Sequence, residues 1–185
     1  SITLTGFQMP ESNKSSWYYF LNNGTVARGW LKDNGFWYYF NNSGLMTTNR
    51  WIKHTNGYWY YVGATGEMAT NCWIHTGGYW YYVNGSGEML TNSWIKHNGY
   101  WYYVNSNGEM MTGWIRYNGD WYALSSTGEM LTGWVKHNGS WYYCRTAENV
   151  PKAGREGAML KNCTCRINGK LYRFNLSGKC LNPYI

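Results

Sequence analysis

The sequence predicts an all-β fold: a solenoid of stacked β-hairpins, with about eight repeats of 20–22 residues and degenerate end repeats. Three observations predict it. Tryptophan recurs with a fixed period, a turn dipeptide stands between paired tryptophans, and 23 Gly with only 3 Pro in 185 residues suit many short strands and turns. A single hairpin is marginal in water, so the repeats must stack to bury one another's faces.

The first strand of each repeat starts at a tryptophan, followed by Ile, Val or Leu and then a basic residue. These leading tryptophans follow one another at intervals of 20 to 22 residues: Trp30, Trp51, Trp73, Trp94, Trp114 and Trp134. A fixed period of this length is the sequence signature of a repeat architecture.

A tight turn and a second strand complete each hairpin. The turn is a Gly preceded by Asn or Gly, as in Asn34-Gly35 and Gly77-Gly78, and such dipeptides supply the positive φ angles of two-residue hairpin loops. The second strand has the form W-Y-Y-[FV] and begins at or near a second series of tryptophans: Trp17, Trp37, Trp59, Trp80, Trp101, Trp121 and Trp141. A Gly-x-Met connector such as Gly66-Glu67-Met68 then leads to the next repeat.

The regularity of the repeats divides the chain into three segments. Residues 1–27 form a degenerate N-terminal repeat with Phe7 as its leading aromatic residue, and residues 28–143 carry the regular repeats. Residues 144–185 contain an inserted loop and a degenerate capping repeat, in which Cys163 and Leu171 are expected to replace the two tryptophans. Atypical end repeats are typical of caps on an open array. The sequence suits a mature protein or an excised fragment, and a catalytic or effector domain could precede Ser1.

The composition supports a folded, aromatic interior. Aromatic residues make up 20% of the chain, with 13 Trp and 19 Tyr. Because the chain has few aliphatic residues, these rings are expected to fill most of the core. No apolar run approaches the roughly 20 residues of a membrane span, so no transmembrane segment is expected. The net charge of +7 is spread along the chain. The five cysteines leave at least one thiol unpaired within the chain.

The repeated aromatic residues predict a binding chemistry. Alternate side chains of a strand share a face, and the leading tryptophan lies on the paired strand. Two Trp, one Tyr and a nearby Met therefore form an electron-rich box that attracts a quaternary ammonium group, at about 0.5 to 2 kcal/mol per ring. Single sites would bind weakly, and repeated sites on a polymer would gain by avidity. The alternative is that these aromatic residues only form the core.

The repeats resemble a known family. Residues 132–143, TGWVKHNGSWYY, and the recurrent Gly-Glu-Met-x-Thr are similar to the choline-binding repeats of Gram-positive surface proteins, autolysins and phage lysins. The resemblance covers nearly the whole chain. It implies a left-handed hairpin solenoid in which two Trp of one repeat, an aromatic residue of the next and a Met wall hold choline.

Carried over residue by residue, the resemblance implies four complete choline sites. Each has two Trp, a Met and a closing Tyr: Trp30, Trp37, Met46 and Tyr61; Trp51, Trp59, Met68 and Tyr82; Trp73, Trp80, Met89 and Tyr103; Trp114, Trp121, Met130 and Tyr143. Three further sites are expected to be weak or empty. Ala123 and Arg173 stand where a closing Tyr is expected, and Phe7 with Val26 leaves the first repeat incomplete.

The resemblance also implies the biological setting. We expect a non-catalytic module that needs no cofactor and binds choline or phosphocholine. Its expected partners are the choline-decorated teichoic and lipoteichoic acids of a bacterial cell wall, which makes it a secreted protein of the cell surface. An end repeat could also support a dimer.

Two alternatives stay open, and other functions are set aside. A glucan- or oligosaccharide-binding repeat array would also display aromatic hairpins, and the chain could be the C-terminal targeting part of a cell-wall hydrolase. No catalytic residues and no nucleic-acid partner are expected, and the recurring His54, His97 and His137 belong to the repeat. No metal is expected, since Cys144, Cys163, Cys165 and Cys180 match no zinc module; a disulfide or buried thiols are the expected use of these cysteines.

Overall fold

A computed structural model describes residues 5–9, 16–148 and 154–183 of the chain. Over these ranges the protein is all-β, without a helix, and its 16 strands pair as eight antiparallel hairpins, which confirms the predicted fold class. The chain forms two compact units that divide between Leu90 and Thr91. Within the described ranges, no helical segment has the length and apolar character that a membrane crossing requires.

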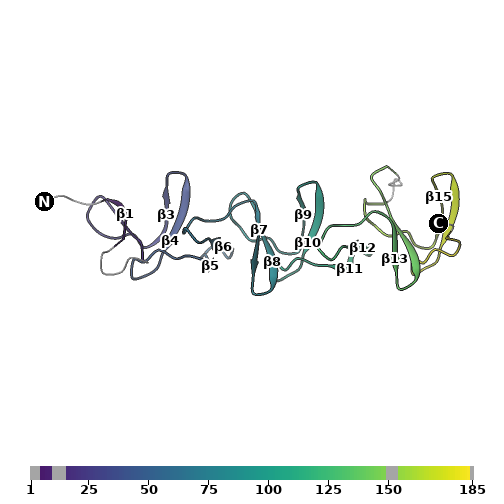
Figure 1. The fold of residues 1–185 in the computed structure, drawn as a ribbon, viewed down its shortest axis with the longest axis horizontal. Coiled ribbons are helices and arrows are strands. Elements are labelled where there is room, and N and C mark those ends of the chain that lie inside the picture. The colour runs from purple at the N-terminus through teal and green to yellow at the C-terminus, as the bar shows by residue number, and fades with distance from the viewer. Residues whose placement is uncertain (1–4, 10–15, 149–153, 184–185) are drawn as a thin grey trace. The chain divides into compact units, whose positions relative to one another are not determined.

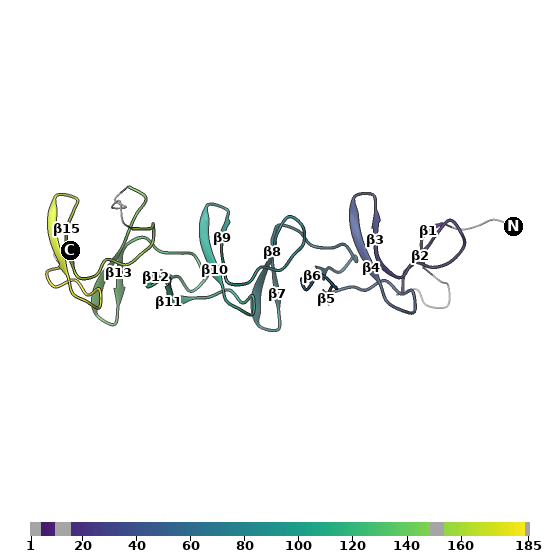
Figure 2. The same cartoon turned by 180° about the vertical axis from the view of Figure 1, so that it is seen from behind.

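The first unit contains four hairpins. Their strands are β1 (Gly6–Gln8) with β2 (Tyr18–Phe20), β3 (Gly29–Asp33) with β4 (Phe36–Phe40), β5 (Arg50–Lys53) with β6 (Trp59–Val62), and β7 (Cys72–Thr76) with β8 (Tyr79–Val83). The hairpins β3–β4 and β7–β8, which are separated by β5–β6, project in different directions in both views (Figures 1 and 2).

The second unit repeats this plan with four more hairpins. They pair β9 (Ser93–His97) with β10 (Tyr100–Val104), β11 (Gly113–Tyr117) with β12 (Asp120–Leu124), β13 (Gly133–His137) with β14 (Ser140–Cys144), and β15 (Cys163–Ile167) with β16 (Lys170–Phe174). The inserted loop precedes β15, and the part of it containing Asn149, Val150 and Pro151 lies outside the described residues. The three-segment division by repeat regularity stays a prediction.

The expected turn chemistry is present between the strands. Asn34 has a φ of 49° and Gly35 a φ of 84°, and Asn98 and Gly99 have φ angles of 50° and 84°. Positive φ at both central residues matches the twist of the flanking strands and is the reason for the Asn-Gly dipeptides. The turns therefore fix the register of each hairpin, such as Trp30 opposite Tyr39 in β3–β4.

Each hairpin has two different faces because side chains alternate along its strands. In β5–β6, Trp51 lies opposite Tyr61 and Lys53 opposite Trp59, so both tryptophans share one side, which we call the Trp face. Ile52 lies opposite Tyr60 on the other side, the Tyr face. This division places the two adjacent tyrosines of every W-Y-Y motif on opposite sides of the hairpin.

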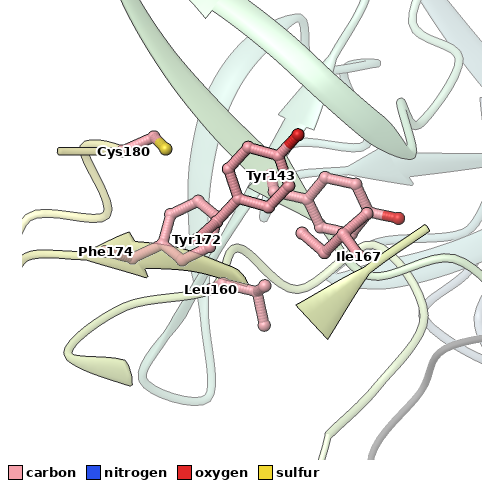
Figure 3. Close-up of a cluster of buried hydrophobic side chains, with 6 residues drawn as sticks. All are labelled: Tyr143, Leu160, Ile167, Tyr172, Phe174 and Cys180. Atoms are coloured by element: carbon pink, nitrogen blue, oxygen red, sulfur yellow. The ribbon is translucent and has the colours of Figure 1, made fainter. Parts of the chain in front are cut away.

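Connectors join each hairpin to the next and cover the core. The last residue of the second strand is fully buried in several hairpins, with 0% exposure for Phe40, Val62 and Val83, and it bridges to the connector, as Val62 does to Met68. The buried cluster at the C-terminal end is drawn in Figure 3: Tyr143, Leu160, Ile167, Tyr172, Phe174 and Cys180. Neighbouring hairpins thus supply one another's interior, as expected for a repeat array.

The last hairpin corrects one sequence assignment. Thr164, and not Cys163, occupies the position of a leading tryptophan, because Thr164 lies opposite Arg173 as Trp134 lies opposite Tyr143. Leu171 does occupy the second tryptophan position, opposite Arg166. The error arose because the inserted loop removes the regular spacing that fixes the register elsewhere.

Candidate choline-binding site

The site is clearest at the junction between β3–β4 and β5–β6. A cavity of about 280 Å³ is lined by Trp30 and Trp37 from the Trp face of β3–β4, by Tyr60 from the Tyr face of the next hairpin, and by Met68 from a connector. The ring centroids of Trp30 and Tyr60 are 5.6 Å apart, at an interplanar angle of 68°. We call these four residues the Trp30 box.

Backbone hydrogen bonds place the methionine in the box. The Met68 N–H donates to the carbonyl of Trp37 at 2.8 Å, so the connector of the following repeat runs against the second tryptophan. The side chain of Trp37 remains 39% exposed. The box therefore has three aromatic walls and a thioether floor, with one side open to a ligand.

The same arrangement recurs in both units. In the first unit, Trp51 contacts Tyr81 at 5.6 Å and the Met89 N–H donates to the Trp59 carbonyl at 2.9 Å. In the second unit three further boxes have ring-centroid distances of 5.0, 5.4 and 4.8 Å between the leading Trp and the closing Tyr. Their members are Trp94, Trp101, Tyr122 and Met130; Trp114, Trp121, Tyr142 and Met159; Trp134, Trp141, Tyr172 and Cys180.

These boxes correct the grouping that the sequence predicted, although Trp30 and Trp37 share a box as expected. The structure does not bring Tyr61 to Trp30; Tyr61 contacts Trp51 of its own hairpin at 5.1 Å. The same holds for the other second tyrosines, since Tyr82, Tyr103 and Tyr143 contact Trp73, Trp94 and Trp134 of their own hairpins at 5.0 to 5.1 Å. Within each unit the first tyrosine of the motif closes the preceding box because it lies on the Tyr face, as Tyr60, Tyr81 and Tyr142 show.

The predicted methionines shift by one repeat for a related reason. The Met46 N–H donates to the carbonyl of Trp17, not to one in β3–β4. Met68, Met89 and Met130 likewise lie against Trp37, Trp59 and Trp101. Each of these connectors reaches back to the hairpin before its own. The set of Trp73, Trp80, Met89 and Tyr103 is thereby divided, since Met89 belongs with Trp59 and Tyr103 packs on Trp94.

The three sites expected to be weak each have three aromatic walls, and their occupancy stays a prediction. Tyr122 closes the box of Trp94 and Trp101, which encloses about 200 Å³, so Ala123 on the opposite face does not open it. Tyr172 closes the box of Trp134 and Trp141 in the same way, and Arg173 is not involved. In the first repeat, Phe7 stands 4.7 Å from Tyr38 and lines a cavity with Trp17 and Met46.

A rim position next to the leading tryptophan was missed by sequence reasoning, although its periodic recurrence was visible. It is the residue after the basic residue of the first strand, and it lies on the Tyr face. His54 lines the Trp30 box, and Thr76 accepts a 2.9 Å hydrogen bond from the indole N–H of Trp51. Tyr117 lies 5.9 Å from Trp94 and His137 lies 6.3 Å from Trp114. The rim residue therefore contacts the leading tryptophan of the preceding hairpin.

Basic residues of the Trp face stand over the second tryptophans. The ammonium groups of Lys32, Lys53, Lys96 and Lys136 lie 5.6 to 6.0 Å from the ring centroids of the Trp residues opposite them. His75 takes this position in β7–β8 and stacks on Trp80 at 4.5 Å. Part of the positive charge is thus a repeated feature of the hairpins. Exposed cation–π pairs of this kind contribute about 0.5 to 1 kcal/mol each.

The cysteines form no disulfide: Cys72, Cys144, Cys163, Cys165 and Cys180 are all free thiols, all within the described ranges. The Sγ atoms of Cys163 and Cys165 are 3.5 Å apart. Burial raises the pKa of Cys144 to about 12, and burial together with Cys165 raises the pKa of Cys163 to about 11. Within the described residues, no group of three or more metal-ligating side chains occurs.

Comparisons with known proteins agree with this geometry. Three family models match the chain: two described as choline-binding repeats cover residues 4–51 with 93–131 and residues 45–87, and one described as a cell wall binding repeat covers residues 132–146. A search of curated protein sequences finds no match.

Solved structures give the same result. The chain is 36% identical to choline-binding protein F from Streptococcus pneumoniae, with a TM-score of 0.72 over 97% of this chain and 58% of that one. It is 34% identical to CbpJ from the same organism, with a TM-score of 0.74 over 96% of this chain and 58% of that one. The choline-binding domain of CbpL from Streptococcus pneumoniae, 24% identical with a TM-score of 0.69 over 99% and 100% of the two chains, is similar in fold.

Stacked hairpins with aromatic boxes at junctions within each of the two units define a class of repeat protein with ligand-sized pockets between its repeats. The chain belongs to the choline-binding repeat proteins, and it is a choline-binding module. It spans about 58% of the length of the first of these relatives.

Proposed function

We propose that the chain attaches without catalysis to phosphocholine groups on the teichoic and lipoteichoic acids of a bacterial cell wall. The observation that supports this most strongly is the recurrence of a box with three aromatic walls, closed in most cases by a methionine. Negative ring faces attract a trimethylammonium group, which is weakly hydrated and therefore loses little on leaving water. Several boxes in one chain would meet several cholines of one polymer, and avidity would then make the attachment firm. Attachment of this kind would place the chain at the cell surface.

Choline titration of the intact 185-residue chain tests this proposal. Saturating choline should change the tryptophan fluorescence and raise the melting temperature, because binding to the folded state alone stabilises it, by about 2.7 kcal/mol per site at 100 times Kd. Dextran at equal monomer concentration is the matched control for the glucan-binding alternative. A response to dextran together with no response to choline would show that the boxes bind a sugar and not choline.

The absence of hydrolysis is part of the same proposal. The repeats offer periodic boxes rather than a nucleophile, base and orienting group held in one geometry, which catalysis requires. Incubation of the chain with purified choline-containing walls should release no more soluble fragments than a heat-inactivated sample. Release above that control would assign the chain an activity of its own.

Dimerisation through an end repeat remains a proposal as well. Sedimentation of the chain with and without choline measures it directly. The expected result is a dimer, and substitutions on the exposed face of the end hairpin should convert it to a monomer.

A further inference from the structure

Two boxes with the same walls have different rims. In the Trp30 box, Gly87 lies over Met68, since a Cβ on Gly87 would come within 2.7 Å of the Met68 methyl carbon. In the box of Trp94, Trp101, Tyr122 and Met130, which we call the Trp94 box, Gly157 lies over Met130 in the same way. The residues just before each of these glycines therefore occupy corresponding places at the rims, with Ser86 lining the Trp30 box and Glu156 lining the Trp94 box.

The residues at these corresponding places differ in charge. The pair before Gly87 is Gly85-Ser86, and Ser86 lines the Trp30 box. The pair before Gly157 is Arg155-Glu156, at the end of the inserted loop, and both residues line the Trp94 box. The insertion thus adds one positive and one negative side chain to the rim of a box that is otherwise built like its relatives.

Arg155 is held beside the Trp94 box by the ring of Tyr117, a residue type that differs from those at the same position in other hairpins. The guanidinium of Arg155 lies over Tyr117 at 5.4 Å from the ring centroid. Tyr117 occupies the rim position that His54 and Thr76 occupy elsewhere, and it contacts both Trp94 at 5.9 Å and Tyr122 at 6.4 Å. A tyrosine face supports a guanidinium better than histidine or threonine can.

The backbone around Arg155 is also fixed. The Ala158 N–H donates to the carbonyl of Arg155 at 3.1 Å, and the Gly157 N–H donates to the carbonyl of Arg145 at 2.7 Å. Burial raises the pKa of Tyr122, and the charges of Arg155 and Arg145 oppose that rise while Asp120 adds to it. The closing ring of the box therefore lies within the electrostatic reach of Arg155.

This charge pattern suits a zwitterion better than a bare cation. A second positive charge at the rim opposes a lone trimethylammonium group, whereas it attracts a ligand that carries a phosphate a few bonds from its ammonium group. Guanidinium is well suited to phosphate because its parallel N–H donors match two oxygens. Glu156 supplies the opposite charge at the same rim and favours the ammonium end.

From this geometry we infer that the Trp94 box is a phosphocholine-selective site, in which the aromatic walls hold the ammonium group and Arg155 contacts the phosphate, while the Trp30 box does not distinguish phosphocholine from choline. The inference rests on the proposed function, since it assumes that the boxes bind choline. It assigns a role to Arg155 and Glu156 at the end of the inserted loop. Both rim residues are exposed, so a preference of about fivefold is expected, the upper end of what exposed ion pairs provide.

The test compares the two boxes within the same molecule. The indole N–H signals of Trp37 and Trp101, assigned by substitution with phenylalanine, report separately on the Trp30 and Trp94 boxes in NMR titrations of the full chain. Choline and phosphocholine are titrated at low and at high salt. The ratio of the two dissociation constants at Trp101 should favour phosphocholine by about fivefold relative to the ratio at Trp37, and high salt should reduce this difference.

A matched variant replaces one rim with the other. Arg155→Gly combined with Glu156→Ser reproduces the Gly85-Ser86 pair, and both altered residues are exposed, so the fold should be retained as judged by the unchanged Trp37 titration. The preference at Trp101 should fall to that at Trp37. Arg155→Gln alone should remove the phosphate preference while the choline affinity rises or stays the same.

The outcomes separate this inference from the proposed function. Equal ratios at the two boxes, or a preference at Trp101 that survives the double substitution, would overturn the inference while choline binding stands. A lack of response to both ligands at both tryptophans would overturn the proposed function itself. Lipoteichoic acid bearing phosphocholine should bind through Trp101 and vesicles of phosphatidylcholine should not; the reverse would overturn the wall polymer as the source.

Discussion

The hairpins β5–β6 and β15–β16 show how one repeat can serve two purposes. Both present a tyrosine on the Tyr face, where Tyr60 packs on Trp30 at 5.6 Å and Tyr172 packs on Trp134 at 4.8 Å. On the Trp face they differ, because β5–β6 carries two tryptophans and β15–β16 carries Thr164 and Leu171 in their positions. The last hairpin therefore closes the box of the preceding hairpin but has no tryptophans with which to form a box of its own.

The difference teaches that the two faces of a repeat can change independently. The Tyr face packs against the preceding hairpin and contributes to its core and its box. The Trp face contributes walls to the hairpin's own box. A terminal repeat needs only the first of these, so the loss of both tryptophans from β15–β16 is the mark of a cap that retains its packing function.

The largest expected effect comes from breaking the packing face of the cap. Tyr172 is 5% exposed, whereas its neighbour Leu171 is 52% exposed. Tyr172→Ala should lower the free energy of unfolding by about 3 kcal/mol, the cost of deleting a buried ring, whereas Leu171→Ala should change it by about 0.5 kcal/mol. Urea unfolding followed by tryptophan fluorescence measures both. Similar losses for the two variants would contradict the assignment of faces.

The fold of these hairpins was predictable and the closure of their boxes was not. The tryptophan period and the Asn-Gly turns fix the hairpins and their register, because strand periodicity and turn chemistry act locally. Tyr60 and Tyr61 are the same residue type in adjacent positions, and the choice between them depends on which face meets the preceding hairpin. That orientation is a property of the stack, which no single repeat encodes.

The same limit explains the other differences. Because the second tyrosine was assigned as the closing residue, Ala123 and Arg173 were interpreted as missing walls. Both lie at positions that do not close a box. The rim positions were visible as a recurring histidine, but their contact with the preceding leading tryptophan required the stacked hairpins. The pairing of Arg155 with Tyr117 joins residues far apart in the sequence, one of them from the irregular loop.

A second comparison separates the two tyrosines of β6. Tyr60→Ala should weaken choline binding at the Trp30 box by about twofold to thirtyfold, because one aromatic wall contributes about 0.5 to 2 kcal/mol. Tyr61→Ala should leave the choline titration of the Trp37 signal unchanged, since Tyr61 packs on Trp51 instead. The Trp37 indole signal in NMR titrations measures both effects. A stronger effect of Tyr61→Ala at Trp37 would restore the grouping predicted from the sequence.

The smallest effect concerns one buried position that the two regions fill differently. Val62 ends β6 and Cys144 ends β14, and each is 0% exposed. Burial raises the pKa of Cys144 from 9.0 to about 12, an effect larger than the opposing contributions of Ala123 and Arg145. The folded state therefore keeps the thiol protonated at a pH where the unfolded chain releases the proton.

The sign of the resulting pH dependence follows directly. Below pH 9 the thiol is protonated in both states and its full contribution to stability is present; between pH 9 and about 12 that contribution is progressively lost. At pH 10, one unit above the ordinary thiol pKa of 9.0, the loss is about 1.4 kcal/mol. The variant Cys144→Val, which copies the residue at the end of β6, removes this titration and keeps an apolar side chain.

The urea midpoint should therefore fall less between pH 7 and pH 10 in the variant than in the native chain. Cys163 is present in both proteins, so its contribution cancels from the difference. An identical fall in the two proteins would mean that Cys144 does not titrate in this way, and that the position is equivalent to Val62 in charge as well as in packing.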